Sequence, residues 1–382
     1  MSSENRIELL RKILKVPTIN ENEGRIADII EAALKDLPNL TFTRVQYAPG
    51  RDNLIVDINQ PENQSKVLGF NGHLDVVDTG NTDLWTYAPF AAVMTDDRIY
   101  GRGAADMKAG VAAMVCAVKE LLEAGATFNG GIRLLFTVGE EIDNFGARQL
   151  SALGYSQPLT ALVVGEPTGQ AIWHAHKGII DFTAQATGKS AHGAMPELGI
   201  NAIDHLFDFY AQAKQTMAPL LAKVDPDLGQ TTFNVTLISG GNQINSIPQF
   251  AKLRGNIRTV TAVPNETIIA ALKAATAEIN TLPEHKIELT IDSTINAISS
   301  PANSEIATCV QNAAKTHAWP VKLTVGAPTT DAALFETDQH QFPFIVIGPG
   351  NTSAHQVDEY VTIQDYLKVT DIYKSVITQY LA

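Results

Sequence analysis

The chain has 382 residues, which is long enough for two domains or for one large domain with an insertion. Hydrophobic residues make up 45% and charged residues 18%, a balance that excludes a disordered or fibrous protein. The 28 Lys and Arg against 41 Asp and Glu give a net charge of −13, which repels polyanions and makes nucleic acid and acidic membrane surfaces poor partners.

The N-terminal segment has no basic start followed by an apolar core, and no stretch approaches the roughly 18 apolar residues of a membrane span. We therefore expect a cytoplasmic protein without a membrane partner. Cys116 and Cys309 lie in apolar patterns of helical period, and both are expected to be buried thiols.

Apolar runs alternate with helical patterns along the chain, which predicts an α/β fold. Four runs rich in Val, Leu, Ile and Phe predict buried strands of a mostly parallel central sheet, at residues 67–70, 132–138, 161–164 and 344–347. The pattern of 107–124 predicts a helix that ends at Gly125, and 362–382 predicts an amphipathic helix. Ligands of such folds bind beyond the carboxyl ends of the strands, so the residues found there are candidates for function.

Histidine and acidic residues follow all four predicted strands. They are His73 and Asp75 after the first strand, Glu140 and Glu141 after the second, Glu166 after the third and His355 after the fourth, with Asp106 before the long helix. A single surface acid is more often solvated than a ligand, but the shared position of these residues favours one common site. Imidazole and carboxylate ligands without cysteine favour a borderline or hard divalent cation such as Zn²⁺. Without metal, several like charges would be forced together at this edge.

Five segments resemble, in order and spacing, the signature of the M20 family of metallopeptidases and deacylases. They are HLDVV at 73–77, GRGAADMK at 101–108, EE at 140–141, GEP at 165–167 and AH at 354–355. The resemblance covers most of the chain and is greatest for the acetylornithine deacetylase and succinyl-diaminopimelate desuccinylase branch. It implies a zinc-peptidase-like catalytic domain that binds two Zn²⁺ ions per subunit, for which Co²⁺ or Mn²⁺ could substitute.

The same resemblance implies a ligand role for five residues. His73 and Glu166 would bind one Zn²⁺, His355 and Glu141 would bind the other, and Asp106 would bridge them.

Two further acids at this edge are implied to act in catalysis. The carboxylate of Asp75 would orient the imidazole of His73. Glu140 would be the general base, taking a proton from the attacking water and returning it to the leaving amine.

The resemblance also implies a second domain inserted after the third strand. Predicted strands at 178–187, 231–239, 250–258 and 286–291 and predicted helices at 201–217 and 265–279 follow the β-α-β-β-α-β order of a ferredoxin-like fold. We place this dimerisation and lid domain at residues 177–292 and the catalytic domain at 1–176 and 293–382. In relatives the insert forms the homodimer. A histidine matching His192 reaches the partner subunit's site and helps to hold the oxyanion.

Three residues are candidates for substrate binding. Asn245 lies in a Gly-rich segment that resembles a substrate-facing turn of the family, and Arg258 matches a carboxylate-binding arginine. A surface ion pair explains Arg258 equally well. The backbone N–H of Gly350 could bind a second carboxylate, although a plain tight turn explains this glycine equally well.

Glu166 stands where aminopeptidases of the family tend to carry Asp, which favours an N-acyl amino acid substrate. Succinyl-diaminopimelate is the first candidate and N-acetylornithine the second. The segment 326–332, GAPTTDA, lacks the arginine of the Ser-Asp-Gly-Arg pattern expected in desuccinylases. A dipeptidase or carboxypeptidase is also compatible with the motifs, and a catalytically silent dimeric scaffold is the non-enzymatic interpretation.

Overall fold

The computed structural model describes residues 1–336 and 340–382 and divides them into two compact units. The first unit comprises residues 1–174, 300–326 and 330–382, and the second comprises 175–299 and 327–329. The predicted insert, 177–292, falls inside the second unit. Each unit has its own hydrophobic core and is described separately.

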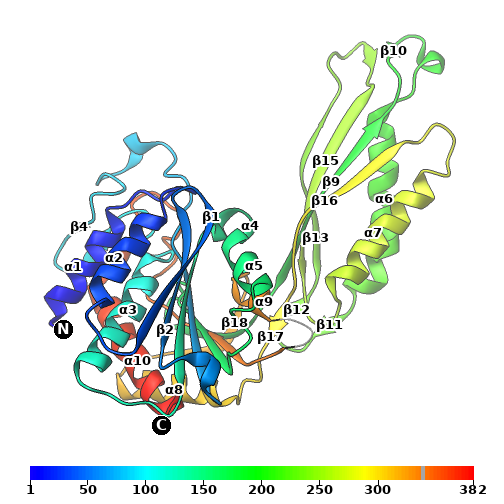
Figure 1. Cartoon of the computed structure of the whole chain (residues 1–382). Coiled ribbons are helices and arrows are strands. Elements are labelled where there is room, and N and C mark those ends of the chain that lie inside the picture. Colours follow the sequence, from blue (N-terminus) through cyan, green and yellow to red (C-terminus); the bar gives the residue numbers. More distant parts are fainter. Residues whose placement is uncertain (337–339) are drawn as a thin grey trace. The chain divides into compact units, whose positions relative to one another are not determined.

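A nine-stranded sheet organises the first unit (Figure 1). Its strands lie in the order β1 (Leu40–Ala48), β2 (Arg51–Ile58), β6 (Gly131–Thr137), β3 (Val67–His73), β7 (Ala161–Val164), β19 (Phe344–Val346), β8 (Ala171–His176) and β17 (Ile298–Ser299), with β18 (Lys322–Gly326) paired to β8. The last two residues of β8 and both residues of β17, which pair with each other, are counted in the second unit. The four central strands β6, β3, β7 and β19 are parallel to one another, whereas β1, β2, β8 and β17 join by antiparallel pairing. The four strands predicted from apolar runs are therefore confirmed, and they form the parallel centre of the sheet.

Helices cover both faces of this sheet. The helices of the unit are α1 (Ser3–Leu14), α2 (Gly24–Leu34), α3 (Lys108–Glu123), α4 (Glu140–Asp143), α5 (Phe145–Ala152), α8 (Glu305–Thr316), α9 (Ala332–Phe335) and α10 (Ile363–Tyr380). The main core unites α1, α2, α3, α8 and α10 with one sheet face, while α5 contacts β1, β6 and α9 (Figure 1). Because both faces are covered, every residue of β3, β6 and β7 is buried.

Several local features of the first unit agree with the sequence. Helix α3 ends before Gly125, whose amide donates to the carbonyl of Leu122 while that of Ala126 donates to Leu121, a Schellman cap. Helix α10 begins after Thr362, whose hydroxyl accepts from the amide of Asp365. Both cysteines are buried free thiols, as predicted.

Smaller elements complete the first unit. A three-stranded sheet has the order β20 (Tyr360–Thr362), β5 (Arg98–Tyr100) and β4 (Val93–Met94), and two short 3₁₀ helices are η1 (Pro61–Asn63) and η2 (Thr82–Leu84). In the described parts of the chain, no helix has both the length and the apolar character required to cross a bilayer.

The second unit consists of a four-stranded antiparallel sheet with two helices packed on it. Its sheet has the order β13 (Thr232–Gly240), β15 (Phe250–Thr259), β9 (Gly178–Thr187) and β16 (Ile287–Ile295), and its helices are α6 (Ala202–Leu221) and α7 (Asn265–Ile279). Along the chain these elements follow the β-α-β-β-α-β order of a ferredoxin-like fold. Minor elements are β10 (Ala191–His192), paired with β14 (Ser246–Ile247), β11 (Val224–Asp225), paired with β12 (Gly229–Gln230), and η3 (Pro196–Leu198).

Candidate active site

The carboxyl ends of the central parallel strands deliver the candidate ligands to one edge of the sheet. His73 is the last residue of β3, Glu141 lies in the short helix that follows β6, and Glu166 follows β7. Asp106 lies just before α3. This helix approaches the end of β7 so closely that a Cβ added at Gly110 would lie 2.2 Å from the carbonyl oxygen of Gly165. Only glycine permits this contact, which brings the start of α3 to the edge of the sheet.

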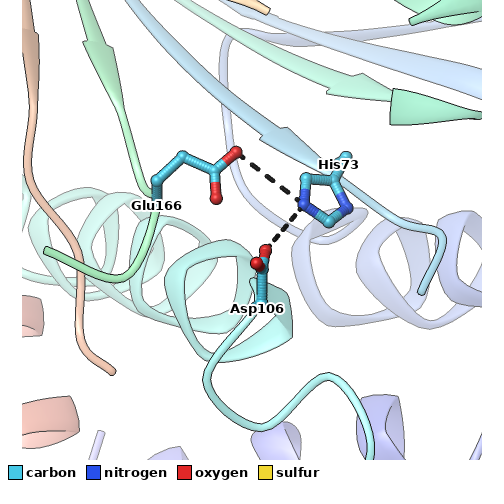
Figure 2. Close-up of side chains that lie close together, drawn as sticks. All are labelled: His73, Asp106 and Glu166. Carbon is cyan, nitrogen blue, oxygen red and sulfur yellow. Dashed lines mark hydrogen bonds and ion pairs between the residues drawn. The ribbon is translucent and has the colours of Figure 1, made fainter. Parts of the chain in front are cut away.

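His73, Asp106 and Glu166 form the first of two candidate ligand groups (Figure 2). The Nε2 atom of His73 lies 3.0 Å from Oδ1 of Asp106 and 3.7 Å from Oε1 of Glu166. His73 and Glu166 are buried, with 1% and 8% of their surface exposed. The three side chains converge on one point from three separate segments of the chain.

The second group consists of Asp106, Glu141 and His355. The Nε2 atom of His355 lies 3.3 Å from Oδ2 of Asp106 and 3.1 Å from Oε1 of Glu141. Asp106 thus directs one carboxylate oxygen to each group. The five residues that the sequence nominates as ligands therefore come together, and they form two sets of three that share Asp106.

The hydrogen bonding of His73 suits a metal ligand. Its Nδ1 lies 3.0 Å from the backbone carbonyl oxygen of Asp75, and because a carbonyl only accepts, Nδ1 must carry the proton. Nε2, which faces Asp106 and Glu166, then presents its lone pair to the centre of the group. Such a bond on the far side of the ring is typical of metal-ligating histidines. The residues present therefore fit a divalent cation.

The carboxylate of Asp75 has a different main contact from the expected one. Its Oδ1 lies 3.8 Å from Nδ1 of His73, beyond hydrogen-bond distance, and the backbone carbonyl of Asp75 holds the ring instead. The two carboxylate oxygens each accept, at 3.1 Å, the backbone amide of Glu140 or Glu141. Asp75 therefore ties the end of β3 to the start of α4, which carries these two glutamates.

The pKa values at the site reflect burial and crowded negative charge. Burial, followed by repulsion from Asp106, raises the pKa of Glu166 well above its ordinary value. Burial also raises the pKa of Glu141. Hydrogen bonds to Asp106 and Glu141 raise the pKa of His355 to about 10. Burial of His73 opposes protonation, but the charge of Glu166 and the hydrogen bond to Asp106 outweigh it and raise the His73 pKa. Uncompensated negative charge of this kind is what a bound cation would neutralise.

Glu140, the predicted base, lies beside the second ligand group. Burial, and after it the charges of Asp331 and Glu141, raise its pKa well above the ordinary value, although His73 opposes this. One of its oxygens, Oε1, accepts a hydrogen bond of 3.2 Å from Nδ2 of Asn144.

Two functional candidates of this edge are missing from the sequence prediction. Glu359 is fully buried, and its carboxylate accepts the backbone amides of Gly103, Ala105 and Asp106 at 2.8 to 3.1 Å. Its partner Arg102 lies at 2.6 Å and also donates to the carbonyl of Gln356. The pair therefore connects the segment of the shared ligand with the segment that follows His355. Arg102 lies within the GRGAADMK segment, but the sequence assigned it no role. No pattern pointed to Glu359, since an acid four residues after a candidate ligand is common on a surface.

His192 and Asn245 lie close together in the second unit. The amide of Gly193 donates to the carbonyl of Asn245 at 2.8 Å, and His192 pairs with Ser246 across β10 and β14. His192 and Asn245 are both exposed. Arg258 is not close to this pair. It lies near the C-terminal end of β15, the strand that begins at Phe250, and its Nε donates to Oδ1 of Asn256.

Gly350 belongs to the first unit and is buried. Its φ is 141°, and an added Cβ would lie 2.6 Å from Pro167 and 3.0 Å from the carbonyl of Ala105. Close packing therefore explains this glycine, and its binding of a substrate carboxylate stays a prediction.

Comparisons with known proteins agree with this geometry. Residues 69–379 match the profile of "Peptidase family M20/M25/M40". A probable succinyl-diaminopimelate desuccinylase of Staphylococcus aureus strain MRSA252 is 35% identical over 407 aligned residues, covering 100% of this chain and 98% of the relative. The succinyl-diaminopimelate desuccinylase of Maricaulis maris is 31% identical, covering 98% of this chain and 96% of the relative.

Solved structures share the fold. The M20 family metallo-carboxypeptidase Sso-CP2 of Sulfolobus solfataricus matches with a TM-score of 0.82 and 19% identity, covering 100% of this chain and 99% of that one. Bacillus subtilis YXEP, described as a dinuclear metal-binding peptidase of family M20, matches with a TM-score of 0.71 and 16% identity, covering 99% and 98%. The sequence match over most of the chain and the full-length relatives show that this protein belongs to peptidase family M20/M25/M40 and is a hydrolase of amide bonds.

Proposed function

We propose that the protein is a dinuclear zinc-dependent hydrolase that cleaves the amide bond of a small N-acyl amino acid, with succinyl-diaminopimelate as the first candidate. One observation carries the proposal, namely two groups of ligating side chains that share Asp106 and lie next to Glu140. The full-length relatives named as succinyl-diaminopimelate desuccinylases support the choice of substrate. The non-enzymatic interpretation, a catalytically silent scaffold, is wrong, because the chain belongs to a family of amide hydrolases and is similar to desuccinylases over its full length.

The ligand chemistry supports zinc as the metal. Each group offers one imidazole and two carboxylates, a set that suits Zn²⁺ and also admits Co²⁺ or Mn²⁺. His73 and Glu166 would hold one ion, His355 and Glu141 the other, and Asp106 both. Bound divalent cations would polarise the substrate carbonyl and lower the pKa of water to about 7.

Glu140 would move the proton in the reaction. Its Oε1 is held by Asn144, so Oε2 is the oxygen available to take a proton from the attacking water. The water oxygen forms the new bond to the acyl carbon, the C–N bond breaks, and the same proton passes from Glu140 to the leaving amine nitrogen. Burial raises the pKa of Glu140, which favours a group that holds the proton before it returns it to the leaving amine.

The candidate substrates differ in the acyl group that the enzyme would remove. The segment 326–332 supplies no arginine for the distal carboxylate of a succinyl group, which favours N-acetylornithine or a dipeptide as competing substrates. Asn245, Arg258 and the amide of Gly350 remain proposed substrate contacts, and His192 a proposed oxyanion donor.

A substrate panel tests the proposal. Purified enzyme loaded with Zn²⁺ is assayed with succinyl-diaminopimelate, N-acetylornithine and a set of dipeptides, and kcat/KM is compared. We expect the highest kcat/KM for succinyl-diaminopimelate. A preference for N-acetylornithine or for dipeptides would replace the substrate while keeping the reaction class. Hydrolysis of none of them, with both metal sites occupied, would contradict the proposed function.

We also propose that residues 177–292 form a lid and homodimerisation domain. Strand β13 is at the edge of its sheet, and Leu237 and Ile238 on it are 59% and 58% exposed. An apolar edge of this kind favours pairing with a second copy of the chain. Sedimentation velocity should show a dimer for the wild type and a monomer for Leu237→Lys. Leu84→Lys, which removes a similarly exposed leucine of the first unit, should stay dimeric.

A further inference from the structure

The orientation of Glu140 depends on one buried amide. Asn144 donates from Nδ2 to Oε1 of Glu140 at 3.2 Å. Among the residues that the structure describes, this hydrogen bond is the one that holds the carboxylate of Glu140. A base that is free to rotate would spend much of its time away from the proton it must take. What fixes Asn144 therefore also fixes the base.

Asn144 is held on both sides. Only 4% of its surface is exposed, and the same Nδ2 donates to Oδ1 of Asp331 at 2.9 Å. Both Nδ2 hydrogens therefore point at carboxylate oxygens, an arrangement in which the amide oxygen could not take the place of the nitrogen. The backbone of Asn144 has a φ of 52°, a left-handed conformation that Asn tolerates better than most residues.

Asp331 is itself anchored to the central sheet. It is 1% exposed, and its Oδ2 accepts from the hydroxyl of Thr137, the last residue of β6, at 2.6 Å. Thr137 in turn lies 3.4 Å from Nδ2 of Asn71 on β3, the strand that ends in His73. The chain of contacts from Asn71 through Thr137, Asp331 and Asn144 to Glu140 starts and ends at the same edge of the sheet.

The surroundings of Asp331 indicate that its carboxylate does not serve only to stabilise the fold. Among the described residues, this buried carboxylate has two neutral hydrogen-bond donors, Thr137 and Asn144, and no ion pair within 4 Å. Burying an acid without a cation is costly, so such acids are concentrated at functional sites. Its two oxygens are instead used to connect the sheet with the amide that holds Glu140.

We propose that Asp331 and Asn144 are positioning residues for the general base, Asp331 by orienting the Asn144 amide and Asn144 by holding Oε1 of Glu140 so that Oε2 faces the water. The inference rests on the proposed function, in which Glu140 is the base. Neither residue is a ligand of the candidate metal groups, so their loss should affect proton transfer and leave metal binding unchanged.

Two substitutions test the proposal. Asp331→Asn replaces one acceptor oxygen by a donor, so either Thr137 or Asn144 loses its acceptor. Asn144→Gly removes the amide and keeps a backbone that adopts positive φ without strain. For both we expect kcat to fall by about 10- to 100-fold. We expect KM to change by less than about threefold and two metal ions per chain to remain, measured by elemental analysis.

Asp143→Asn is the matched control, because it removes the same charge from the residue next to Asn144 without touching Glu140. It should keep kcat within about twofold of the wild type. Glu140→Ala, assayed alongside, separates the positioning role of Asp331 and Asn144 from the proposed function of Glu140 as the base. If Glu140→Ala loses turnover while Asp331→Asn and Asn144→Gly keep it, the positioning role is wrong and the proposed function stands.

Two further outcomes would overturn the inference. If the metal content of Asp331→Asn and Asn144→Gly falls together with kcat, the network supports the metal centre and not the base. If Glu140→Ala itself keeps near-normal turnover, the base assignment fails, and with it the role of both residues. Should Asp331→Asn not fold, Asn144→Gly alone decides, since glycine adopts the positive φ of position 144 without strain.

Discussion

The carboxylate of Glu359 accepts a hydrogen bond of 3.0 Å from the backbone amide of Asp106, a residue 253 positions earlier in the chain. The same oxygen accepts the amide of Ala105 at 2.8 Å, and the other oxygen accepts from Arg102 at 2.6 Å. The loop that carries the shared ligand is therefore fixed by a buried ion pair and not by its own sequence. Mutations of this pair should affect the metal centre without touching a ligand.

Glu359→Gln should weaken metal binding. The amide group cannot accept from all of the backbone amides that the carboxylate serves, and Arg102 becomes a buried cation without its partner. We expect the metal dissociation constant to rise by about 10- to 100-fold. The free energy of unfolding should fall by about 3 kcal/mol. Calorimetric Zn²⁺ titration and chemical denaturation measure the two effects. Glu305→Gln, which breaks an exposed pair with Lys66, should change neither by much.

Glu140→Ala and Glu141→Ala should separate catalysis from metal binding, although the residues are neighbours. Glu140 lies outside both ligand groups and Glu141 lies inside the second one. Glu140→Ala should therefore lower kcat by about 10²- to 10⁴-fold with two metal ions retained. Glu141→Ala should reduce the metal content of the purified protein. Equal metal loss in both variants would show that Glu140 is not distinct from the ligands.

Removal of metal should abolish activity and lower thermal stability. Without cations, the carboxylates of Asp106, Glu141 and Glu166 lie together at one edge. A free metal concentration about 1,000 times the dissociation constant stabilises the folded state by about 4 kcal/mol per site. Activity and the unfolding temperature are measured after EDTA treatment and again after addition of Zn²⁺, Co²⁺ or Mn²⁺. EDTA already saturated with Zn²⁺ is the control, and unchanged stability of metal-free protein would argue against the centre.

A mixture of two inactive variants should recover activity if His192 serves the partner subunit. His192→Ala should lower kcat by about 10²- to 10³-fold, the range for loss of an oxyanion donor. In a heterodimer with Glu140→Ala, one site has both an intact Glu140 and the partner's His192. A random 1:1 mixture should then reach about a quarter of wild-type activity. No recovery, with heterodimers verified by mass spectrometry, would exclude a contribution across the dimer.

Stability at low pH should depend on Glu120. Although burial opposes it, hydrogen bonds from Arg6 and Lys374 lower the pKa of Glu120 from 4.5 to about 2. The group stabilises the fold above a pH of about 4.5 by roughly 3 kcal/mol, and this is lost as the pH falls to about 2.

Glu120→Gln should accordingly be less stable than the wild type at pH 7, and the difference should shrink steadily below pH 4.5. Urea denaturation followed by circular dichroism at several pH values measures this. Glu123→Gln is the control, because Glu123 lies on the same helix but its side chain is 40% exposed. A difference between wild type and Glu120→Gln that stays constant down to pH 2 would contradict the assignment.

The fold was predictable where burial leaves a simple pattern. β3, β6 and β7 are buried on both faces, so their sequences are continuous apolar runs. β1 has no buried residue, its apolar side chains are mixed with polar ones, and it is not among the predicted strands. β2 is also missing from the predicted strands although its residues 53–56 are buried, so burial alone did not make every strand of the sheet predictable.

The amino-acid sequence by itself determined which side chains reach the edge of the sheet, because a residue at the carboxyl end of a parallel strand has its position set by local chain geometry. His73, Glu141 and Glu166 belong to this class. Only the tertiary structure decided how these side chains are held. The backbone carbonyl of Asp75 fixes the ring of His73, Glu359 fixes the loop of Asp106, and Asp331 lies 187 residues from the Asn144 amide that it orients. The contacts of Glu359 and Asp331 join segments that are far apart in sequence, and a hydrogen bond between such segments leaves no periodic pattern in either of them.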